Sequence, residues 1–483
     1  MADIKTTNQR PKHEISAKDK IPVSQKICYG VGGLSDFFIR NTIQALAIPI
    51  FAVGMKLDPR ILGIALAATK IVSAFADPAA GIISDKTNSR WGRRKPFLIV
   101  TAVIAAILCP LIFRVPDGSQ TFQFGYIFAI LSFYFLTQSF YSVPYIALGF
   151  ELSDDYDERT NIFAWKNYIC MIGVFVGTWT YWFTLRPCFG NEMNGAQVLC
   201  AITGIIVIIG AIMVTRGTHE IGERYKIKKD KIPALKALQI TFTNKSFLMI
   251  QGAVLVVALG VGIDATIGMY LHVHYTCEGN KDFASVIGGV GGTVSTLVIF
   301  SALAFATWAS RRWSKKATAI IGISVMLIGS CSIPWLMSPV LPWLIVIVWM
   351  LNQFGAQSSN MMYESMMADV CDEDELKTGE RREGSYAAAK NSLYKMVEVA
   401  VLILSGLMPS LAGYVDTSVP PTMEQLEKMK FLLCSTDVAG IASALIFLCF
   451  YPLSRSRCKD IRRQLDERIK KDTEATAIDE TVQ

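Results

Sequence analysis

The sequence has few of the residues and none of the motifs on which soluble enzymes depend. It contains no phosphate-binding glycine loop, nucleophile elbow or dinucleotide fingerprint. Among only 4 histidines the nearest pair is His272 and His274, which lacks a third metal ligand. The 11 cysteines show no CxxC or Cys/His spacing, and a disulfide among Cys188, Cys200 and Cys277 stays open. We therefore expect no enzymatic activity, no resident metal or cofactor, and no ATP-driven pump.

Charge is scarce as well, and it lies between long apolar segments rather than within them. Only 18% of the residues are charged, whereas 52% are hydrophobic. Segments of about 20 apolar residues are long enough to cross a bilayer, and they must be helical because a backbone in lipid has to satisfy its own hydrogen bonds. The sequence predicts twelve such helices, at residues 28–54, 61–84, 96–114, 122–150, 162–185, 198–215, 247–272, 286–308, 317–337, 340–369, 386–415 and 429–452.

The basic residues are unevenly divided between the two sides of the membrane. If both chain ends and every second connection lie on one side, that side holds about three quarters of the 47 Lys and Arg residues. By the positive-inside rule this side, with both termini, is cytoplasmic. The net charge of +7 then indicates contact with anionic lipid headgroups and not nucleic-acid binding. We expect an integral protein of a bacterial inner membrane or a plasma membrane, whose first helix stays as an anchor.

A long basic segment divides the chain into two halves with six apolar segments each. The predicted parts are a cytoplasmic tail at 1–27, a six-helix bundle at 28–215, a cytoplasmic linker at 216–246, a second six-helix bundle at 247–452 and a cytoplasmic tail at 453–483.

One connection carries the most specific pattern in the chain, GIISDKTNSRWGRRKP from Gly81 to Pro96. Its spacing resembles the loop after the second helix in the major facilitator superfamily. Gly81 is expected to let another helix approach closely, and Asp85 is expected to accept hydrogen bonds from the loop arginines or a helix N-terminus.

Acidic clusters repeat at corresponding places in the two halves. One begins at Glu151 after the fourth apolar segment, and the other begins at Asp369 after the tenth. The basic residues at 311–316 occupy in the second half the place that 90–95 occupy in the first. This correspondence favours duplication of a six-helix unit.

These stretches, with YGVGGLSDFF from Tyr29 and DELKTGERREGSY from Asp374, narrow the resemblance to the glycoside, pentoside and hexuronide to cation symporters, the melibiose-carrier branch of that superfamily. The resemblance implies an all-α membrane protein with two pseudo-symmetric six-helix bundles around a central polar cavity. It also implies alternating access, a small polar substrate moved together with Na⁺ or H⁺, and function as a monomer. A cytoplasmic gate is expected at Gly81, Asp85, Arg90, Gly92, Arg93, Glu151, Arg159, Asp369 and Arg381.

Charged residues at membrane depth indicate where the cavity lies, because an ionisable group there is costly unless it is paired or hydrated. Asp36 and Arg40 are four apart in the first helix and can pair, which is also a purely structural explanation for both. The other charges in helices include Lys70, Asp77, Asp264, Lys390, Lys395, Glu398 and Asp437.

The resemblance assigns roles to several of these positions. Lys395 falls on the lysine that links the sugar and cation sites in the family, Lys390 on a nearby sugar-facing position, and Asp77 on the second acid of the cation site. The first acid of that site is Ser73, and the fourth-helix acid is Ser142. Asp36 matches a sugar-binding acid only with a one-residue slip.

Because two of the family's four carboxylates are missing, three coupling schemes stay open. Na⁺ is held by Asp77 with the hydroxyls of Ser73 and Ser139, or Asp77 carries a proton beside Lys395 or Lys70, or transport is uncoupled.

The substrate is expected to be a glycoside, or a sugar acid such as a hexuronide, since cations predominate among the predicted substrate-binding residues. These are Asp36, Arg40, Ser142, Lys166, Lys390 and Lys395, although the cations are also explained as counter-charges of Asp36 and Asp77. A lipid or other small-solute carrier, and a non-transporting sensor, are alternatives with the same fold.

Overall fold

The computed structural model describes residues 21–55, 57, 59–87, 89, 92–153, 156–218, 242–379, 383–414, 420–465 and 467–468, and within these ranges it contains helices and no strands. The first half comprises α1 (Val23–Ala47) with the π-helix η1 (Ile48–Gly54), α2 (Pro59–Lys86), α3 (Lys95–Ile112), α4 (Gln120–Glu151), α5 (Tyr156–Gly177), α6 (Thr180–Thr184), η2 (Pro187–Phe189) and α7 (Glu192–Gly217). The second half comprises α9 (Lys245–Leu271) with η3 (His272–Thr276), α10 (Lys281–Arg312), α11 (Lys315–Cys331), α12 (Ile333–Leu336), η4 (Pro342–Leu344), α13 (Ile345–Thr378), α14 (Glu383–Leu411) and α15 (Met423–Cys449).

Each predicted apolar segment contains one long helix, so the all-helical prediction is confirmed. Nine helices in the described part are long and apolar enough to cross a membrane. The three predicted spans outside this set are α5, α11 and α13. The short α11 has 17 residues, and α13 ends in an acidic sequence. A helix that packs against other helices or a hydrated cavity needs less hydropathy than one that faces lipid.

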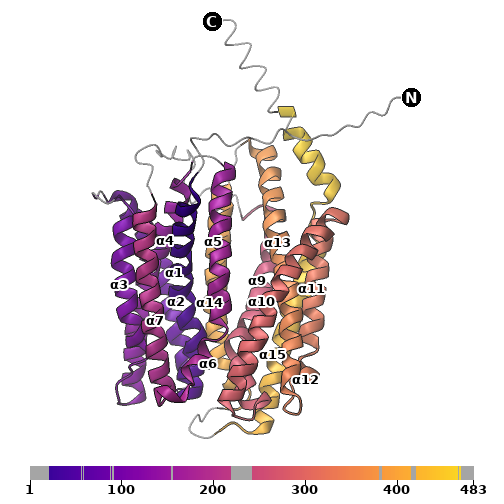
Figure 1. The fold of residues 1–483 in the computed structure, drawn as a ribbon. Coiled ribbons are helices and arrows are strands. Elements are labelled where there is room, and N and C mark those ends of the chain that lie inside the picture. The colour runs from indigo at the N-terminus through magenta and orange to yellow at the C-terminus, as the bar shows by residue number, and fades with distance from the viewer. Residues whose placement is uncertain are drawn as a thin grey trace, which may run out of the picture.

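Two groups of helices stand side by side (Figure 1). One buried apolar cluster joins residues of α1 to α7, a second lies in the second half, and a third joins second-half residues to Val53 of η1. The packing repeats: α1 contacts α5 and α7, as α9 contacts α14 and α15, and α3 contacts α7 as α11 contacts α15. The pair α2 and α14 makes a close contact between the groups, where a Cβ on Gly63 would lie 2.6 Å from the Leu402 carbonyl oxygen. We call these groups the first and second bundle.

Two lysines show the same internal repeat at atomic detail. Lys95, at the start of α3, donates to the carbonyl of Thr218 just past α7, at 2.5 Å. Lys316, in the first turn of α11, donates to the carbonyls of Cys449 and Tyr451 at the end of α15, at 2.9 and 3.0 Å. Because a helix leaves its last carbonyls without intrahelical donors, each lysine caps the final helix of its bundle.

Tyrosines fix α4 against α1, and this contact sets the position of the first-helix charges. Tyr134, Tyr141 and Tyr145 donate to the carbonyls of Ile39, Gly32 and Tyr29, at 2.8, 3.2 and 2.7 Å. All three rings are buried. A buried hydroxyl needs a partner, and here each partner lies on the neighbouring helix.

We call the end of the molecule where α2, α4 and α13 finish the motif end, because it carries Asp85, Glu151 and Asp369, and we call the other the opposite end. The acidic residues after Asp369 were expected in a loop, yet they belong to α13, whose buried Glu373 accepts from Ser246 at 2.7 Å. Most of the predicted linker lies outside the described residues. Of the predicted tail, 455–465 is helical and buries Ile461 and Leu465 against the second bundle. All 11 cysteines lie in the described part, and none forms a disulfide.

Candidate functional site

An ion pair joins the two bundles halfway along α2 and α14. The Asp77 carboxylate accepts from the Lys395 ammonium across a sequence separation of 318 residues. Both side chains remain about a third exposed, at 31% and 35%. A carboxylate and an ammonium at membrane depth are tolerated because they are paired and hydrated. The two residues lie where the bundles meet, as a central site requires.

A second ion pair of reversed polarity lies two turns further toward the opposite end. Lys70 Nζ is 3.6 Å from Glu398 Oε2, and it also lies 5.3 Å from the centre of the Phe135 ring. Lys70 and Asp77 share a face of α2, since seven residues make two helical turns. The sequence named Glu398 among the charges that indicate the cavity but gave it no role. The available signal was a base and an acid spaced by seven on α2, matched by a base and an acid on α14.

A cavity of about 250 Å³ lies beside this second pair, between the bundles. Gln44, Lys70 and Glu398 supply its charged and amide groups, and Tyr394 adds a hydroxyl-bearing ring. The remaining lining is apolar: Ile43, Ala47, Leu66, Phe135, Ala258, Gly262, Val397, Val401 and Leu402. A few polar groups in an apolar wall are typical of a small-molecule site.

Asp36 is held by two neighbours on the first-bundle side. Arg40 Nη2 lies 2.8 Å from Asp36 Oδ2, and Ser142 of α4 donates to Asp36 Oδ1. Asp36 is 5% exposed, whereas the side chain of Arg40 is 45% exposed. The structure therefore brings together three of the predicted substrate-binding residues, with the arginine as the accessible member.

Lys166 differs from the other cations at this depth. It packs over Gly33 of α1, where an added Cβ would lie 2.7 Å from Lys166 Cγ, and its ammonium is 5.9 Å from the centre of the Phe163 ring. Among the described residues it has no carboxylate partner. Lys390, by contrast, is paired with Glu364 of α13, an acid that the sequence did not assign to the site.

The predicted oxygen ligands beside Asp77 also meet. Ser73 Oγ lies 3.3 Å from Ser139 Oγ, and Ser73 precedes Asp77 by one turn of α2. Two hydroxyls and a carboxylate on adjacent helices supply oxygen donors without a second acid.

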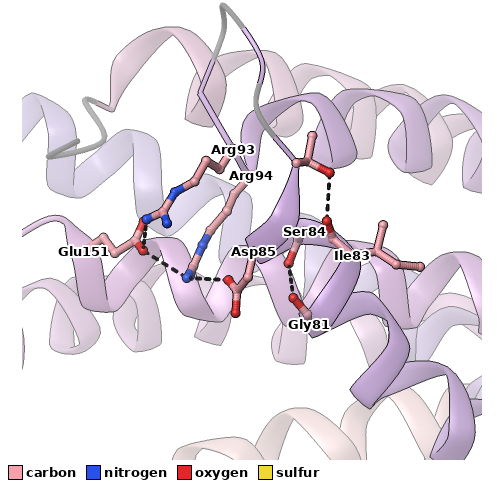
Figure 2. A network of polar contacts seen from close by, with 8 residues as sticks. Gly81, Ile83, Ser84, Asp85, Arg93, Arg94 and Glu151 are labelled. Atoms are coloured by element: carbon pink, nitrogen blue, oxygen red, sulfur yellow. Dashed lines mark hydrogen bonds and ion pairs between the residues drawn. The ribbon is translucent and has the colours of Figure 1, made fainter. Parts of the chain in front are cut away.

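At the motif end, a charged cluster joins the ends of α2, α3 and α4 (Figure 2). Arg94 Nη2 lies 2.9 Å from Glu151 Oε1 and 3.2 Å from Asp85 Oδ1, and Arg93 Nη2 lies 2.8 Å from the same Glu151 oxygen. Arg94, 8% exposed, is the central member of the cluster. Of the two adjacent arginines, the sequence assigned Arg93 and not Arg94 to the gate. Gly92 has a φ of 103°, a conformation that favours glycine.

Other predicted gate residues have different surroundings. A Cβ on Gly81 would meet Val143 at 3.7 Å, an ordinary contact, so in this conformation no helix approaches it unusually closely. Asp369 pairs with Lys315 at 2.6 Å, within the second bundle. Arg90, Arg381 and the side chain of Arg159 lie outside the described residues.

The comparisons with known proteins cover nearly the whole chain. A family model described as MFS/sugar transport protein matches residues 28–455. A putative glycoside/cation symporter of Escherichia coli is 22% identical, covering 92% of this chain and 95% of the relative. A sodium-dependent lysophosphatidylcholine symporter of Gallus gallus is also 22% identical, covering 96% and 93%. The crystal structure of a D-xylose-proton symporter superposes with a TM-score of 0.62 at 14% identity, covering 89% and 98%.

Proposed function

The chain belongs to the MFS/sugar transport family, and on that premise we propose that it carries a glycoside or sugar acid together with a cation. As a member of this family it is an integral membrane transporter and not an enzyme. In the proposal the two bundles rock about the α2 and α14 contact, the motif end faces the cytoplasm, and the chain works as a monomer. The resemblance predicted from the motifs agrees with the family match.

The observation that carries the proposal is the pairing of Asp77 with Lys395 between the bundles. One carboxylate balances one positive charge. A cation that binds Asp77 therefore releases Lys395, which becomes available to the hydroxyls or carboxylate of the substrate. Since a ligand shifts a conformational equilibrium only through its different affinity for the two states, an ion pair that spans the moving bundles is well placed to couple the two bindings.

Neutralising Asp77 tests this scheme. Asp77→Asn is expected to abolish accumulation of labelled sugar in proteoliposomes while leaving exchange and downhill flux. Na⁺ and pH gradients are imposed separately, so that the cation that drives uptake is identified. Ser73→Ala is the companion variant: it weakens the response to Na⁺ if hydroxyls bind the ion, and leaves a proton-driven response unchanged. Retained uphill uptake by Asp77→Asn would contradict the proposal.

The charge balance of the site supports an acidic sugar. Four described acids on the helices of the candidate site have a basic partner: Asp36 with Arg40, Asp77 with Lys395, Glu398 with Lys70 and Glu364 with Lys390. Lys166 of α5 adds one further positive charge. It packs over Gly33 of α1, which is one turn before Asp36. A substrate carboxylate would balance it.

A pair of matched substrates tests the role of Lys166. A glucuronide and a glucoside with the same aglycone differ only in the carboxylate. Lys166→Gln is expected to weaken competition by the glucuronide about tenfold, the effect of losing roughly 1.5 kcal/mol from a charged hydrogen bond, and to leave the glucoside unchanged. Lys166→Arg keeps the charge and serves as the control. An equal effect on both substrates would mean that Lys166 does not bind the carboxylate.

A lysophospholipid is the second candidate substrate. It is favoured by the similarity to the Gallus gallus symporter and by the apolar lining contributed by Leu66, Phe135 and Val401. Uptake of labelled lysolipid for which sugars do not compete would select this candidate over the first.

A further inference from the structure

A second buried acid lies at the centre of the second bundle, away from Asp77. Asp437 stands midway along α15, and its side chain is 0% exposed. The helices are tightly packed there: a Cβ on Gly260 of α9 would lie 3.3 Å from the Asp437 Cα. Ser330 of α11 and Asn352 of α13 complete a junction of four helices.

The hydrogen bonds of this junction do not balance. Ser330 Oγ lies 3.3 Å from Asp437 Oδ2 and 3.4 Å from Asn352 Oδ1. A hydroxyl has one hydrogen, so it donates to one of these oxygens at a time. Asp437 Oδ1 is buried and has no hydrogen-bond partner among the described residues. Rotating the Asn352 amide would bring a donor to Ser330, the residue that Asn352 contacts. The junction therefore has fewer hydrogen-bond donors than acceptors, and Asp437 Oδ1 is the oxygen left without one.

The neighbouring titratable groups that the structure describes provide neither a hydrogen-bond donor nor a counter-charge for Asp437. Asp264 lies on the same face of α9 as Gly260, one turn on, and it adds a second acid that interacts electrostatically with Asp437. Among the described residues, Cys434 lies one turn before Asp437 and interacts with it, with Cys331 and with Lys430, whose ammonium is two turns from Asp437 on α15 and bound to the Tyr275 hydroxyl at 2.6 Å. No basic side chain in the described ranges forms an ion pair with Asp437. A buried carboxylate without a cation is too costly to persist.

We propose that Asp437 is a proton-binding site of the second bundle, occupied at neutral pH in the conformation described here. The site is distinct from the coupling site at Asp77 and goes beyond the proposed function. A proton supplies the missing hydrogen at Oδ1. It needs no additional space around the carboxyl group, which is fully enclosed. When the junction opens to water, the O–H bond breaks, its electron pair stays on Oδ1, and the proton passes to water. The bundle thus gains or loses a proton as its four helices repack.

Infrared spectroscopy of the purified full chain tests the assignment without any transport measurement. The carbonyl stretch of protonated carboxyl groups is expected at neutral pH in the native protein and in Asp77→Asn, and the component that belongs to Asp437 is expected to be lost in Asp437→Asn, which keeps the shape of the side chain. A spectrum that Asp437→Asn leaves unchanged would overturn the proposal. Because the readout needs no substrate, it stands or falls separately from the sugar transport proposed above.

A second variant keeps the test decisive if Asp437→Asn fails to fold. Ser330→Ala retains the carboxyl group but removes the hydroxyl that stabilises the carboxylate, so the band is expected to titrate at higher pH than in the native protein. A titration unaffected by Ser330→Ala would contradict the proposed site.

Discussion

The two ends of the molecule use their charges in different ways. At the opposite end two ion pairs run between the bundles: Arg186 Nη2 lies 2.9 Å from Asp282 Oδ1, and Lys281 pairs with Glu192. Trp179 adds a hydrogen bond from its Nε1 to Thr293 Oγ1 at 3.0 Å. These contacts fasten α10 of the second bundle to the first.

At the motif end, the described ion pairs remain inside one bundle. Arg93 and Arg94 bind Glu151 within the first bundle, and Lys315 binds Asp369 within the second. The contrast indicates a conformation closed at the opposite end, in which the motif-end charges hold each bundle's own helices together. The predicted role of these charges as a gate between bundles stays a prediction for the other conformation.

The largest effect is expected from obstructing the opposite end. A Cβ on Gly289 would lie 2.7 Å from a ring carbon of Trp179, so Gly289→Leu cannot fit without separating the bundles. Overpacking of this kind costs about 1–3 kcal/mol, and 1.4 kcal/mol is about tenfold in an equilibrium. We expect about a tenfold loss of labelled uptake in proteoliposomes.

The neighbouring glycine provides the control for that variant. A Cβ on Gly288 would meet nothing within 4 Å, so Gly288→Leu should transport normally. Equal losses in the two variants would show that bulk on α10, and not closure against Trp179, is responsible.

An intermediate effect is expected from substitutions at the motif end. They should lower the free energy of unfolding and leave the balance between conformations unchanged. Arg94→Gln leaves the buried carboxylate of Glu151, and the exposed carboxylate of Asp85, with fewer donors, at a cost of about 1–3 kcal/mol in the free energy of unfolding. Arg93→Gln, at a side chain that is 37% exposed, should cost less. Thermal unfolding in detergent measures both. If Arg94→Gln changed the distance between spin labels on the two bundles and left stability unaltered, the assignment of this cluster to one bundle would be wrong.

A smaller effect is expected from the partly exposed ion pairs at the opposite end. Lys281→Glu should weaken closure by about 0.2–1 kcal/mol, up to roughly fivefold in population, and adding Glu192→Lys should restore it. Spin-label distances between the bundles report the population. The pair Lys428 and Glu424 lies within α15, so Lys428→Glu should leave the distances unchanged. A swap that restores nothing would remove these charges from the closing mechanism.

The sequence predicted the architecture well because lipid imposes simple rules. Apolar segments of sufficient length have to be helices, and basic connections mark one side. The ends of the helices were less predictable, since α13 continues to Thr378 through residues that are too polar to resemble a span. The Glu364 carboxylate was overlooked for another reason: it lies inside the predicted span 340–369, on a helix whose polar face was not expected.

Partners within the site were harder to predict than its members. The resemblance selected Asp77 and Lys395, but their contact depends on how α2 packs against α14, a register that no local pattern encodes. Arg94 was passed over in favour of Arg93, although Arg94 is the buried residue. Three adjacent basic residues look alike in sequence, and only the direction in which α3 begins decides which of them points inward.

The smallest effect compares a thiol at each end. Cys458 lies on the helix at 455–465, and burial, with the negative charge of Asp369, raises its pKa to about 11. The thiolate is the reactive form, so the raised pKa keeps this thiol protonated and slow to react with maleimide at neutral pH, and its labelling should rise as the pH approaches 11. Exposed Cys188, on η2 at the opposite end, is the reference. Asp369→Asn should lower the pKa of Cys458 and speed its labelling, as peptide mass spectrometry would show. If Cys458 instead labels as fast as Cys188 at neutral pH, the helix at 455–465 does not stay packed against the second bundle, and the motif end is looser than its ion pairs imply.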